Sequence, residues 1–435
     1  MGRRRLIKTT RRDLISSLPV EVKHRILECL PTQDTARTAL LSTNWNDVWS
    51  QRGRLVFDFN FSYRVKQGYF EDKGRTLAGI IDNILLSRAG PIKKFTLDIG
   101  NDYQQSHFDR WCLFLSKNGV EELHISFCNG REAGFKLPFC ILSCRTIKQL
   151  RVEFPIIDLP VNNVGGIFFN VTSLFFSGVE FRPTVNETAS SISISIPNLE
   201  KLAFFKCRGI NKFEISASKL EKLYVRYFVH DVVESRWLAP HLKAIKSLWL
   251  CGSSLLYVDA SLFANAINLQ VLGLDYLSFG CGKQLTVVMQ LLQKCPNLYE
   301  LGIMADPAVC KCDEESTSRL LEDLDGCFIV KDLKMLNTIK IELFSGSTVE
   351  ILFGWEDDDK EVASRLLEDP DGCLVIQELK MQMLNTIQIE SFSGSAFEMF
   401  FMKLLLSKSP ALERVVILKR LGMNASKVRK IQRKL

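Results

Sequence analysis

The sequence predicts an α/β protein in which a short N-terminal segment of three helices precedes a solenoid of parallel strands. Two observations carry this prediction. An apolar pattern recurs eight times between residues 120 and 303, and two prolines bracket a short apolar helix in "SLPVEVKHRILECLP" at 17–31. A third observation, two near-identical segments at 318–353 and 364–401, extends the repeated pattern toward the C-terminus.

The length and composition restrict the class of protein. The chain has 435 residues, enough for two or three domains or for one extended repeat array. Its 46% hydrophobic and 24% charged residues exclude wholesale disorder. Much of the net charge of +7 lies in basic tails at 1–12 and 421–435, which we interpret as solvated chain ends, with nuclear import or attraction to an acidic partner as alternatives. The middle of the chain has no basic stripe with interleaved aromatics, so no nucleic-acid partner is expected.

Targeting signals and cysteines suggest where the protein resides. No apolar run suitable for secretion follows the charged N-terminus, and "AFEMFFMKLLL" is too short to span a bilayer. We therefore expect no membrane partner and a location in the nucleus, the cytoplasm or both. The 13 cysteines, an odd number without an export signal, indicate reduced thiols. "CKC" at 310–312 has no second pair and no histidine at zinc spacing, so neither a metal site nor a cofactor is predicted.

The first helix is predicted between two prolines. Pro19 suits the first turn of a helix because its missing N–H is not needed there, and Ser17 is the expected N-cap. Pro31 ends the helix. At 3.6 residues per turn, one apolar stripe contains Val22, Ile26, Cys29 and Leu30, with Leu27 at its margin.

Two more short helices are expected before residue 50. Thr32 can cap the second helix and Ser42 the third, in which Trp45, Val48 and Trp49 recur at i, i+3 and i+4. Three short helices bury little surface by themselves, and their apolar residues exceed what a core of that size hides. A partner protein or the neighbouring domain is expected to cover the excess. The alternative is that these helices cap the repeat array.

The recurring pattern is an apolar residue, two variable residues, Leu, one variable residue and another apolar residue. Because the L-x-L alternation has period two, each unit is predicted to be a short strand with one buried face. The eight strands stack in parallel, and helices or turns connect them; "RPTVNETASSISIS" at 182–195 is expected to be a loop. The central leucines lie 21 to 29 residues apart, the period of leucine-rich repeats, and are Leu123, Leu150, Leu174, Leu202, Leu223, Leu248, Leu272 and Leu301.

The two C-terminal segments are a tandem duplication. They agree at 24 of 36 positions once the inserted "MQ" at 381–382 is omitted, and the acidic stretch "WEDDDKE" at 355–361 links them. Each copy holds another strand, "LNTIKI" or "LNTIQI", followed by a turn at Gly346 or Gly394. After the second copy the sequence predicts a helix that includes Met399 and residues 404–406, and a last strand around Leu412, Val415 and Ile417, which together can cap the solenoid.

No enzyme motif accompanies this architecture. The sequence has no G-x-S-x-G, no P-loop, no G-x-G-x-x-G and no H-E-x-x-H, and its five histidines are scattered. We therefore expect no catalytic residues. The substrate-binding residues are unknown; candidates are the variable strand residues, for example Glu122, His124, Arg151, Lys222, Tyr224 and Trp249.

Residues 13–49 resemble a plant-type F-box. The matching residues are "LP" at 18–19, "IL" at 26–27, "LPT" at 30–32, Asp34, "ART" at 36–38, "LS" at 41–42, Trp45 and Trp49. The repeats resemble those of plant F-box/leucine-rich-repeat proteins, and residues 384–417 resemble the FBD segment that ends that class. The resemblance covers most of the chain and implies an F-box, a leucine-rich-repeat solenoid and an FBD-like C-terminal cap.

The resemblance also implies a division of the chain into domains. It gives a basic tail at 1–12, an F-box at 13–55, a linking segment at 56–90, leucine-rich repeats at 91–310, a truncated first FBD-like copy with the acidic linker at 311–363, a second FBD-like copy at 364–420 and a basic tail at 421–435.

The implied function is that of a substrate receptor of an SCF-type cullin–RING ubiquitin ligase. The F-box would bind an SKP-type adaptor, and through it cullin and RING subunits, while the repeats hold an unknown substrate protein. The receptor itself would catalyse nothing. Trp49 would hold the third helix, and by family position the residues that form or support the adaptor interface are Leu18, Pro19, Val22, Ile26, Leu27, Leu30, Pro31, Leu41 and Trp45.

One departure from the family pattern surrounds Trp45. The family usually has basic residues there, whereas this chain has Thr43, Asn44 and Asn46. Losing those charges would weaken contact with an acidic adaptor surface. The alternative function is therefore a leucine-rich-repeat scaffold that binds proteins but no longer engages a ligase. A small-molecule receptor is a third class, and no cluster of polar residues in the sequence points to one.

Overall fold

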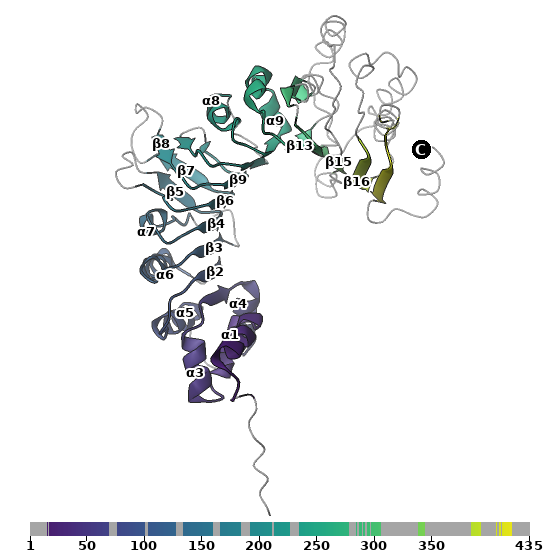
Figure 1. Cartoon of the computed structure of the whole chain (residues 1–435). Helices are drawn as coiled ribbons and strands as arrows, with labels where there is room; N and C mark the ends of the chain where they lie inside the picture. The colour runs from purple at the N-terminus through teal and green to yellow at the C-terminus, as the bar shows by residue number, and fades with distance from the viewer. Residues whose placement is uncertain are drawn as a thin grey trace, which may run out of the picture. The chain divides into compact units, whose positions relative to one another are not determined.

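The chain divides into two units of dense internal contact (Figure 1). Unit 1 comprises residues 1–158 and 165–171, and unit 2 comprises residues 159–164 and 172–435. The computed structural model describes residues 15, 17–68, 76–100, 103–127, 134–159, 166–183, 192–210, 213–226, 235–277, 284, 287–288, 290–291, 294–295, 297–305, 338–343, 384–392, 406, 409 and 411–419.

Unit 1 begins with the three short helices that the sequence predicts. They are α1 (Val20–Cys29), α2 (Thr32–Thr38) and α3 (Thr43–Ser50). The described elements that follow are β1 (Arg54–Phe57), α4 (Phe59–Gly68), α5 (Leu77–Leu86), β2 (Lys94–Ile99), α6 (Gln105–Lys117), β3 (Glu122–Phe127), α7 (Phe139–Leu142), β4 (Gln149–Glu153) and β5 (Ile156–Leu159). Residues 56–90, interpreted from the sequence as a linking segment, therefore contain two helices.

The main sheet of unit 1 is parallel, with the strand order β1-β2-β3-β4. Leu55, Phe95, Leu123 and Leu150 occupy equivalent positions in its register, and all four side chains are buried. Alternate residues point to the other face, as the period-two pattern predicts. β1 and β2 are not among the eight predicted strands, because β1 follows α3 directly and β2 has Phe95 where the pattern has leucine.

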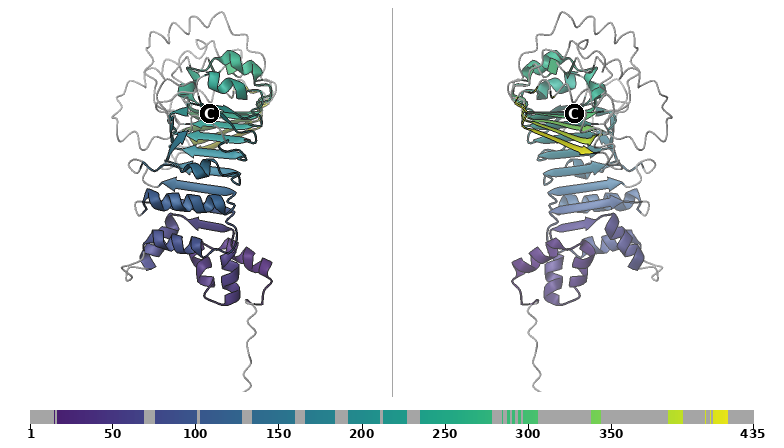
Figure 2. Two further views of the ribbon diagram at one scale, coloured as in Figure 1. Left: turned by 90° about the vertical axis from the view of Figure 1, so that its left-hand side faces the viewer. Right: turned by 90° about the vertical axis from the view of Figure 1, so that its right-hand side faces the viewer.

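Helices α6 and α7 cover one face of this sheet (Figures 1 and 2). Phe108, Trp111 and Leu115 recur along α6 at helical spacing and are buried. The Trp111 Nε1–H donates to Asp82 Oδ1 at 2.7 Å, which joins α6 to α5. The opposite strand face, formed by the variable residues of each strand, is left without a helical cover by these elements.

Unit 2 continues the repeated strands with short helical returns. Its described elements are β6 (Ser173–Ser177), β7 (Glu180–Pro183), β8 (Ile192–Ser195), β9 (Lys201–Phe205), β10 (Phe213–Ser216), β11 (Lys222–Arg226), α8 (Ser235–Leu238), η2 (Ala239–His241), β12 (Ser247–Cys251), α9 (Gly252–Leu255), η3 (Ala260–Asn265), β13 (Val271–Leu277), β14 (Glu300–Ala305), β15 (Thr338–Leu343), β16 (Thr386–Phe392) and β17 (Arg414–Lys419). The main sheet runs β6-β9-β11-β12-β13-β14-β15-β16-β17.

The predicted leucines of unit 2 stack in one register row. Each contacts the next through parallel pairing, and the side chains are at most 4% exposed; the row is Leu174, Leu202, Leu223, Leu248, Leu272 and Leu301. Ile339, Ile387 and Val415 extend the row at the equivalent positions of β15, β16 and β17. The predicted parallel-strand architecture is confirmed.

The duplicated segments each contribute a strand, β15 from the first copy and β16 from the second. The last predicted strand is present as β17, which begins at Arg414 rather than at Leu412. The predicted turns at Gly346 and Gly394, Met399 and the acidic stretch at 355–361 lie outside the described residues.

One expected loop is partly a strand. Residues 182–195 were expected to be irregular because they are rich in Ser and Thr, but β8 occupies Ile192–Ser195 and pairs in parallel with β10. The Ile-Ser alternation explains the error, since Ile194 is buried while Ser193 and Ser195 are exposed. The period-two signal therefore outweighs the polar composition at this point.

The cysteines of the described residues are free thiols. Cys207 and Cys251 are buried, as expected for small apolar side chains. Burial raises the pKa of the Cys207 thiol to about 12, so the thiol stays protonated at neutral pH. Cys128 and the close pair at 310–312 lie outside the described residues.

Candidate functional site

Helix α1 begins directly after Pro19, which occupies the N-cap position in an extended conformation (φ −53°, ψ 147°). No side chain caps this end, so the prediction that Ser17 caps the helix is wrong. Proline occupies the N-cap position and the helix starts at Val20, so Ser17 lies two residues before the cap.

Helix α2 begins in the same way, with Pro31 as its N-cap. Thr32 was expected to be the cap but is the first helical residue. Its hydroxyl instead accepts a hydrogen bond from the Val56 N–H at 2.9 Å and so joins α2 to β1. The third predicted cap is confirmed, because Ser42 Oγ accepts from the Trp45 N–H at 3.3 Å at the start of α3.

Helix α1 has an inner and an outer face. Leu27, placed by the sequence at the margin of the apolar stripe, is completely buried. Val22 and Ile26, the centre of that stripe, are 41% and 37% exposed, and Cys29 is also exposed. The stripe therefore lies on the solvent side of the helix, and Leu30 at its end is half-buried.

The turn between α2 and α3 exposes two further leucines. Leu40 and Leu41 are 87% and 66% exposed. Leu41 is one of the residues named from the sequence, whereas Leu40 and the exposed Val20 were not named as site residues. The sequence could have indicated both residues, since Val20 directly follows Pro19 and Leu40 directly precedes Leu41, and both of those neighbours were named as site residues. We call Val20, Val22, Ile26, Leu40 and Leu41 the exposed apolar set.

The other residues named from the sequence divide by burial. Pro19 and Pro31 are exposed and Leu18 is half-buried. Trp45 and Trp49 are buried on the inner side of α3. The buried residues support the shape of the three helices, while the exposed ones remain available for contact.

The stretch around Trp45 has a structural role of its own. Lys23 of α1 is only 2% exposed, and its Nζ donates to Asn44 Oδ1 at 3.0 Å and lies 5.6 Å from the Trp45 ring centre. Asn44 thus accepts from a buried cation, a contact that a basic residue at this position could not make. Asn44 therefore takes part in a contact between α1 and α3 instead of adding positive charge to the surface.

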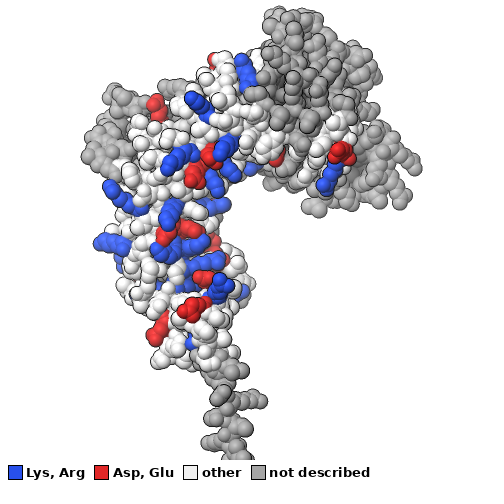
Figure 3. Space-filling view, viewed as in Figure 1, with Lys and Arg blue, Asp and Glu red and all other residues white. Residues whose placement is uncertain are grey.

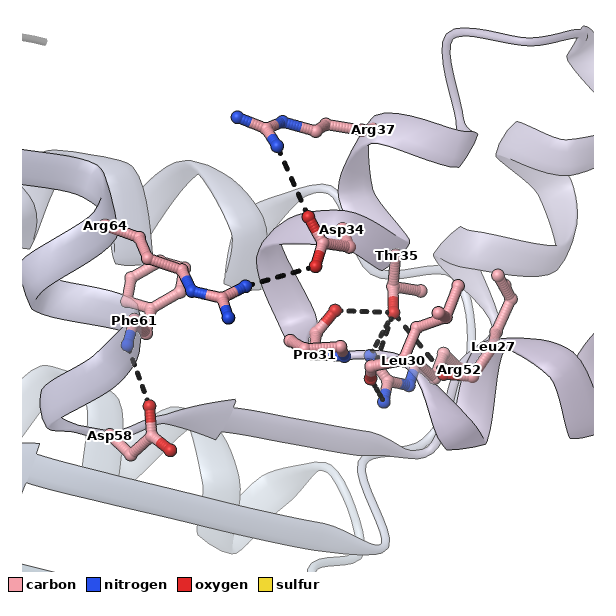
Figure 4. A network of polar contacts seen from close by, with 10 residues as sticks. All are labelled: Leu27, Leu30, Pro31, Asp34, Thr35, Arg37, Arg52, Asp58, Phe61 and Arg64. Carbon is pink, nitrogen blue, oxygen red and sulfur yellow. Dashed lines mark hydrogen bonds and ion pairs between the residues drawn. The ribbon is translucent and has the colours of Figure 1, made fainter. Parts of the chain in front are cut away.

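Arg52 connects the C-terminal end of α1 with α2 through hydrogen bonds (Figure 4). Its Nη1 donates to Thr35 Oγ1 at 2.8 Å and its Nη2 donates to the Leu30 carbonyl at 2.9 Å, while the Thr35 hydroxyl donates to the Pro31 carbonyl at 2.9 Å. Burial, and then the nearby Arg54, lower the pKa of Arg52 to about 10, so the side chain remains charged at neutral pH. Arg52 thereby pairs the carbonyl of Leu30, the C-cap residue of α1.

Asp34 forms a second connection, on the surface. Its carboxylate accepts from Arg37 at 3.3 Å and from Arg64 of α4 at 3.2 Å (Figure 4). Both arginines are about half exposed or more, so these pairs add little stability. They orient α4 against α2 and leave the exposed apolar set uncovered.

The strand-face candidates differ between the units. In unit 1 they are paired: Glu122 lies 2.8 Å from Lys94 Nζ, Arg151 lies 2.7 Å from Glu153, and His124 Nε2 lies 3.5 Å from the same carboxylate. Lys and Arg side chains lie interspersed with Asp and Glu side chains among the described residues seen in Figure 3. In unit 2, Tyr224 and Trp249 stack with ring centres 6.4 Å apart.

The described residues contain neither a metal site nor a membrane-spanning helix. Within those ranges no group of three or more His, Cys, Asp or Glu side chains is arranged to hold a metal ion. No helix in the described part of the chain is long and apolar enough to cross a membrane.

Comparisons with known proteins agree with this arrangement. Residues 15–57 match the F-box domain family, and residues 84–311 match the family of the At1g61320/AtMIF1 leucine-rich-repeat domain. The first match contains the exposed apolar set, and the second covers more than half of the chain.

Similar proteins occur in Arabidopsis thaliana. F-box/FBD/LRR-repeat protein At1g13570 is 27% identical over 374 residues, 78% of this chain and 87% of that protein. Putative F-box protein At3g58860 is 30% identical over 217 residues, 49% of this chain and 46% of that protein. F-box/FBD/LRR-repeat protein At5g56420 is 28% identical over 202 residues, 46% of this chain and 45% of that protein.

Proposed function

The chain belongs to the plant F-box/leucine-rich-repeat proteins, and on this premise we propose that it is the substrate-recognition subunit of an SCF-type cullin–RING ubiquitin ligase. In this role residues 15–57 bind an SKP-type adaptor, and the leucine-rich repeats hold the protein to be ubiquitinated. The chain forms no bond itself. It raises the local concentration of the substrate beside the ubiquitin-conjugating enzyme.

The exposed apolar set is the observation that carries this proposal. Five large apolar side chains within about twenty residues are left in water by a unit that has its own complete core. The set lies on α1 and on the turn between α2 and α3, and exposed apolar groups of this kind are typical of protein interfaces. A partner that covers Val22, Ile26 and Leu41 would remove this apolar surface from water.

The named residues then have two roles. Pro19, Val22, Ile26, Pro31 and Leu41 would contact the adaptor, because their side chains are exposed. The half-buried Leu18 and Leu30 would lie at the edge of the contact. Leu27 and Trp45 would support the helices from inside, since neither has surface to offer a partner.

The test is co-purification with an SKP-type adaptor after Ile26→Asp combined with Leu41→Asp. Both changes place a carboxylate on an exposed position, so the fold is expected to survive. We expect affinity to fall about 100-fold or more, because two central apolar contacts become desolvated charges. A binding titration with purified adaptor measures the loss.

A matched variant controls for added charge. Leu86→Asp combined with Leu113→Asp replaces two exposed leucines on α5 and α6, outside residues 15–57, and should leave adaptor binding unchanged. Equal loss in both double variants, or binding that survives Ile26→Asp with Leu41→Asp, would contradict the proposed interface.

The alternative is a binding scaffold that no longer engages a ligase. It is favoured by the absence of basic residues around Trp45 and by Asn44 being occupied with Lys23. It predicts that the wild-type chain binds no SKP-type adaptor in the same titration while it still binds other proteins.

A further inference from the structure

The strand face of unit 2 carries an aromatic surface that the sequence pattern does not explain. Tyr224, Trp249, Gly273 and Gly302 occupy equivalent register positions on β11, β12, β13 and β14. They are variable positions of the repeat, on the face opposite the buried leucines. Two large rings are thus followed by two residues without side chains.

The glycines allow the indole of Trp249 to lie flat on the sheet. A Cβ atom built at Gly273 would overlap the Trp249 ring, and one built at Gly302 would lie 2.9 Å from its Cη2. Any other residue at Gly273 would push the indole off the sheet. Tyr224 stacks with the indole at an interplanar angle of 22°. We call the two rings, those of Tyr224 and Trp249, the aromatic floor.

One side of the aromatic floor is held by an ion pair across three strands. Arg226 of β11 donates to both carboxylate oxygens of Asp275 on β13, and its Nη2 lies 3.0 Å from Oδ1. Asp275 is completely buried, while Arg226 keeps part of its surface and lies 5.1 Å from the Trp249 ring centre. The pair is formally neutral, and its guanidinium makes a cation–π contact with the Trp249 ring.

The other side carries two lysines without partners. Lys201 of β9 and Lys222 of β11 are direct neighbours in the register and both are exposed. The side-chain Nζ of neither lysine makes a hydrogen bond or an ion pair within the described part of the chain. Like charges placed directly opposite each other destabilise a sheet.

Nearby carboxylates do not relieve this repulsion. Glu221 is paired with Lys246 at 2.7 Å, and Glu200 makes no ion pair with the lysines among the described residues. At the equivalent row of unit 1, by contrast, Lys94 is paired with Glu122. The two lysines of unit 2 therefore carry positive charges that no acidic side chain among the described residues pairs with.

We propose that this surface binds an extended acidic peptide segment of the protein that the repeats recognise. An aromatic side chain of the peptide would stack on Tyr224 and Trp249, and its carboxylates would lie beside Lys201 and Lys222. Charge complementarity selects an acidic partner, and the flat floor selects a planar side chain. This inference deepens the proposed receptor function and rests on it for the identity of the bound protein as a substrate.

The test is a binding titration in which the full chain, without an adaptor, is added to labelled peptides. The fluorescence anisotropy of the peptides measures how much of each is bound. A short peptide of alternating Glu and Tyr is expected to bind, a Glu-Ala peptide more weakly, and a Lys-Tyr peptide not at all. Lys201→Glu combined with Lys222→Glu should weaken the Glu-Tyr peptide about tenfold or more, because two attractions become repulsions. Tyr224→Ala should remove the preference for Glu-Tyr over Glu-Ala.

Lys219→Glu combined with Lys243→Glu is the matched control. Both lysines are exposed and lie outside the strands, so the change in net charge is the same and binding should persist. Circular dichroism establishes that each variant is folded. Lys201→Gln combined with Lys222→Gln removes the two positive charges without adding negative ones, and this double variant should still weaken binding.

Three results would overturn the proposal. They are equal binding of the Glu-Tyr and Lys-Tyr peptides, equal loss in the two double variants, and binding of a single-stranded oligonucleotide in preference to the acidic peptide. Failure of the receptor function is distinguishable, because the wild-type chain would then bind the Glu-Tyr peptide without binding an SKP-type adaptor.

Discussion

Two arginines, the buried Arg52 and the half-buried Arg88, organise the N-terminal helices. Arg52 and Arg88 have pKa values lowered to about 10, chiefly by burial, and both stay charged at neutral pH. Arg88 donates to the Trp49 carbonyl and to the Arg52 carbonyl, and its guanidinium lies 4.6 Å from the Trp49 ring centre. A buried charge bonded to backbone carbonyls is costly to disturb, because removing it leaves several acceptors unpaired.

A buried histidine should make stability depend on pH. His241 of η2 is 3% exposed, lies against Trp237 with ring centres 5.7 Å apart, and its Nε2 has no hydrogen-bond partner among the described residues. Burial lowers the pKa of His241 to about 4 from its ordinary value of 6.5. The unfolded chain therefore takes up a proton at a higher pH than the folded chain does.

This shift has a definite sign. Because the folded pKa is depressed, the neutral histidine is tolerated above about pH 6.5, and stability is lost as the pH falls toward 4. We expect about 2 kcal/mol of the free energy of unfolding to disappear between about pH 7 and pH 5, and His241→Gln to abolish this part of the loss. Urea denaturation at a series of pH values measures it; an unchanged pH slope in His241→Gln would contradict the assignment.

At the scale of single elements, one helix or strand supplies both a core face and a face that lies outside the core. Helix α1 puts Leu27 and Lys23 inside and leaves Val22 and Ile26 outside, so one short helix supplies both core and surface. Strand β12 places Leu248 and Leu250 in the core and Trp249 on the opposite face. Substitutions on the face away from the core can therefore occur without changing the residues of the core face.

The aromatic floor predicts a specific coupling between neighbouring strands. Gly273→Ala should destabilise the fold by about 1–3 kcal/mol, because the new methyl group collides with the Trp249 ring. In the Trp249→Ala background the same change should cost much less, since the obstacle is gone. Urea denaturation of the four proteins gives the coupling energy, and additive effects would show that the ring does not lie over Gly273.

At the scale of the whole molecule, the F-box is bonded to the part of unit 1 that follows it. The Ser50 carbonyl accepts from the N–H groups of Ala89 and Gly90 at 3.0 and 3.3 Å, and Arg88 reaches the end of α3. Thr32 is bonded to β1 through Val56. Unit 1 is thus a folding unit in which the helices and the first strands depend on each other.

Deletion of residues 1–50 should therefore destabilise what remains. Arg52 and Arg88 would lose acceptors while remaining part of the chain, and we expect the thermal midpoint to fall by about 5 °C or more. Differential scanning calorimetry measures the shift. Ile26→Asp with Leu41→Asp should change the midpoint little, and an unshifted midpoint in the deletion would show that the helices are an independent appendage.

Much of the fold follows from local pattern. The eight central leucines, the three short helices and the strands of the duplicated segments were all predictable, because each depends on residues close together in the sequence. The helix caps at Ser17 and Thr32 were predicted wrongly, since Pro19 and Pro31 occupy the cap positions and shift each start by one or two residues.

The sequence by itself determined the order of elements, the repeated buried face and the family resemblance, because periodicity reports on neighbours within one element. Only the tertiary structure decided which side of the α1 stripe faces water, which residues Arg52 and Arg88 bind, and that Lys201 and Lys222 face each other unpaired. These contacts join residues 17 or more positions apart, which the packing of separate elements brings together. A pattern of neighbouring side chains within one element does not predict such contacts.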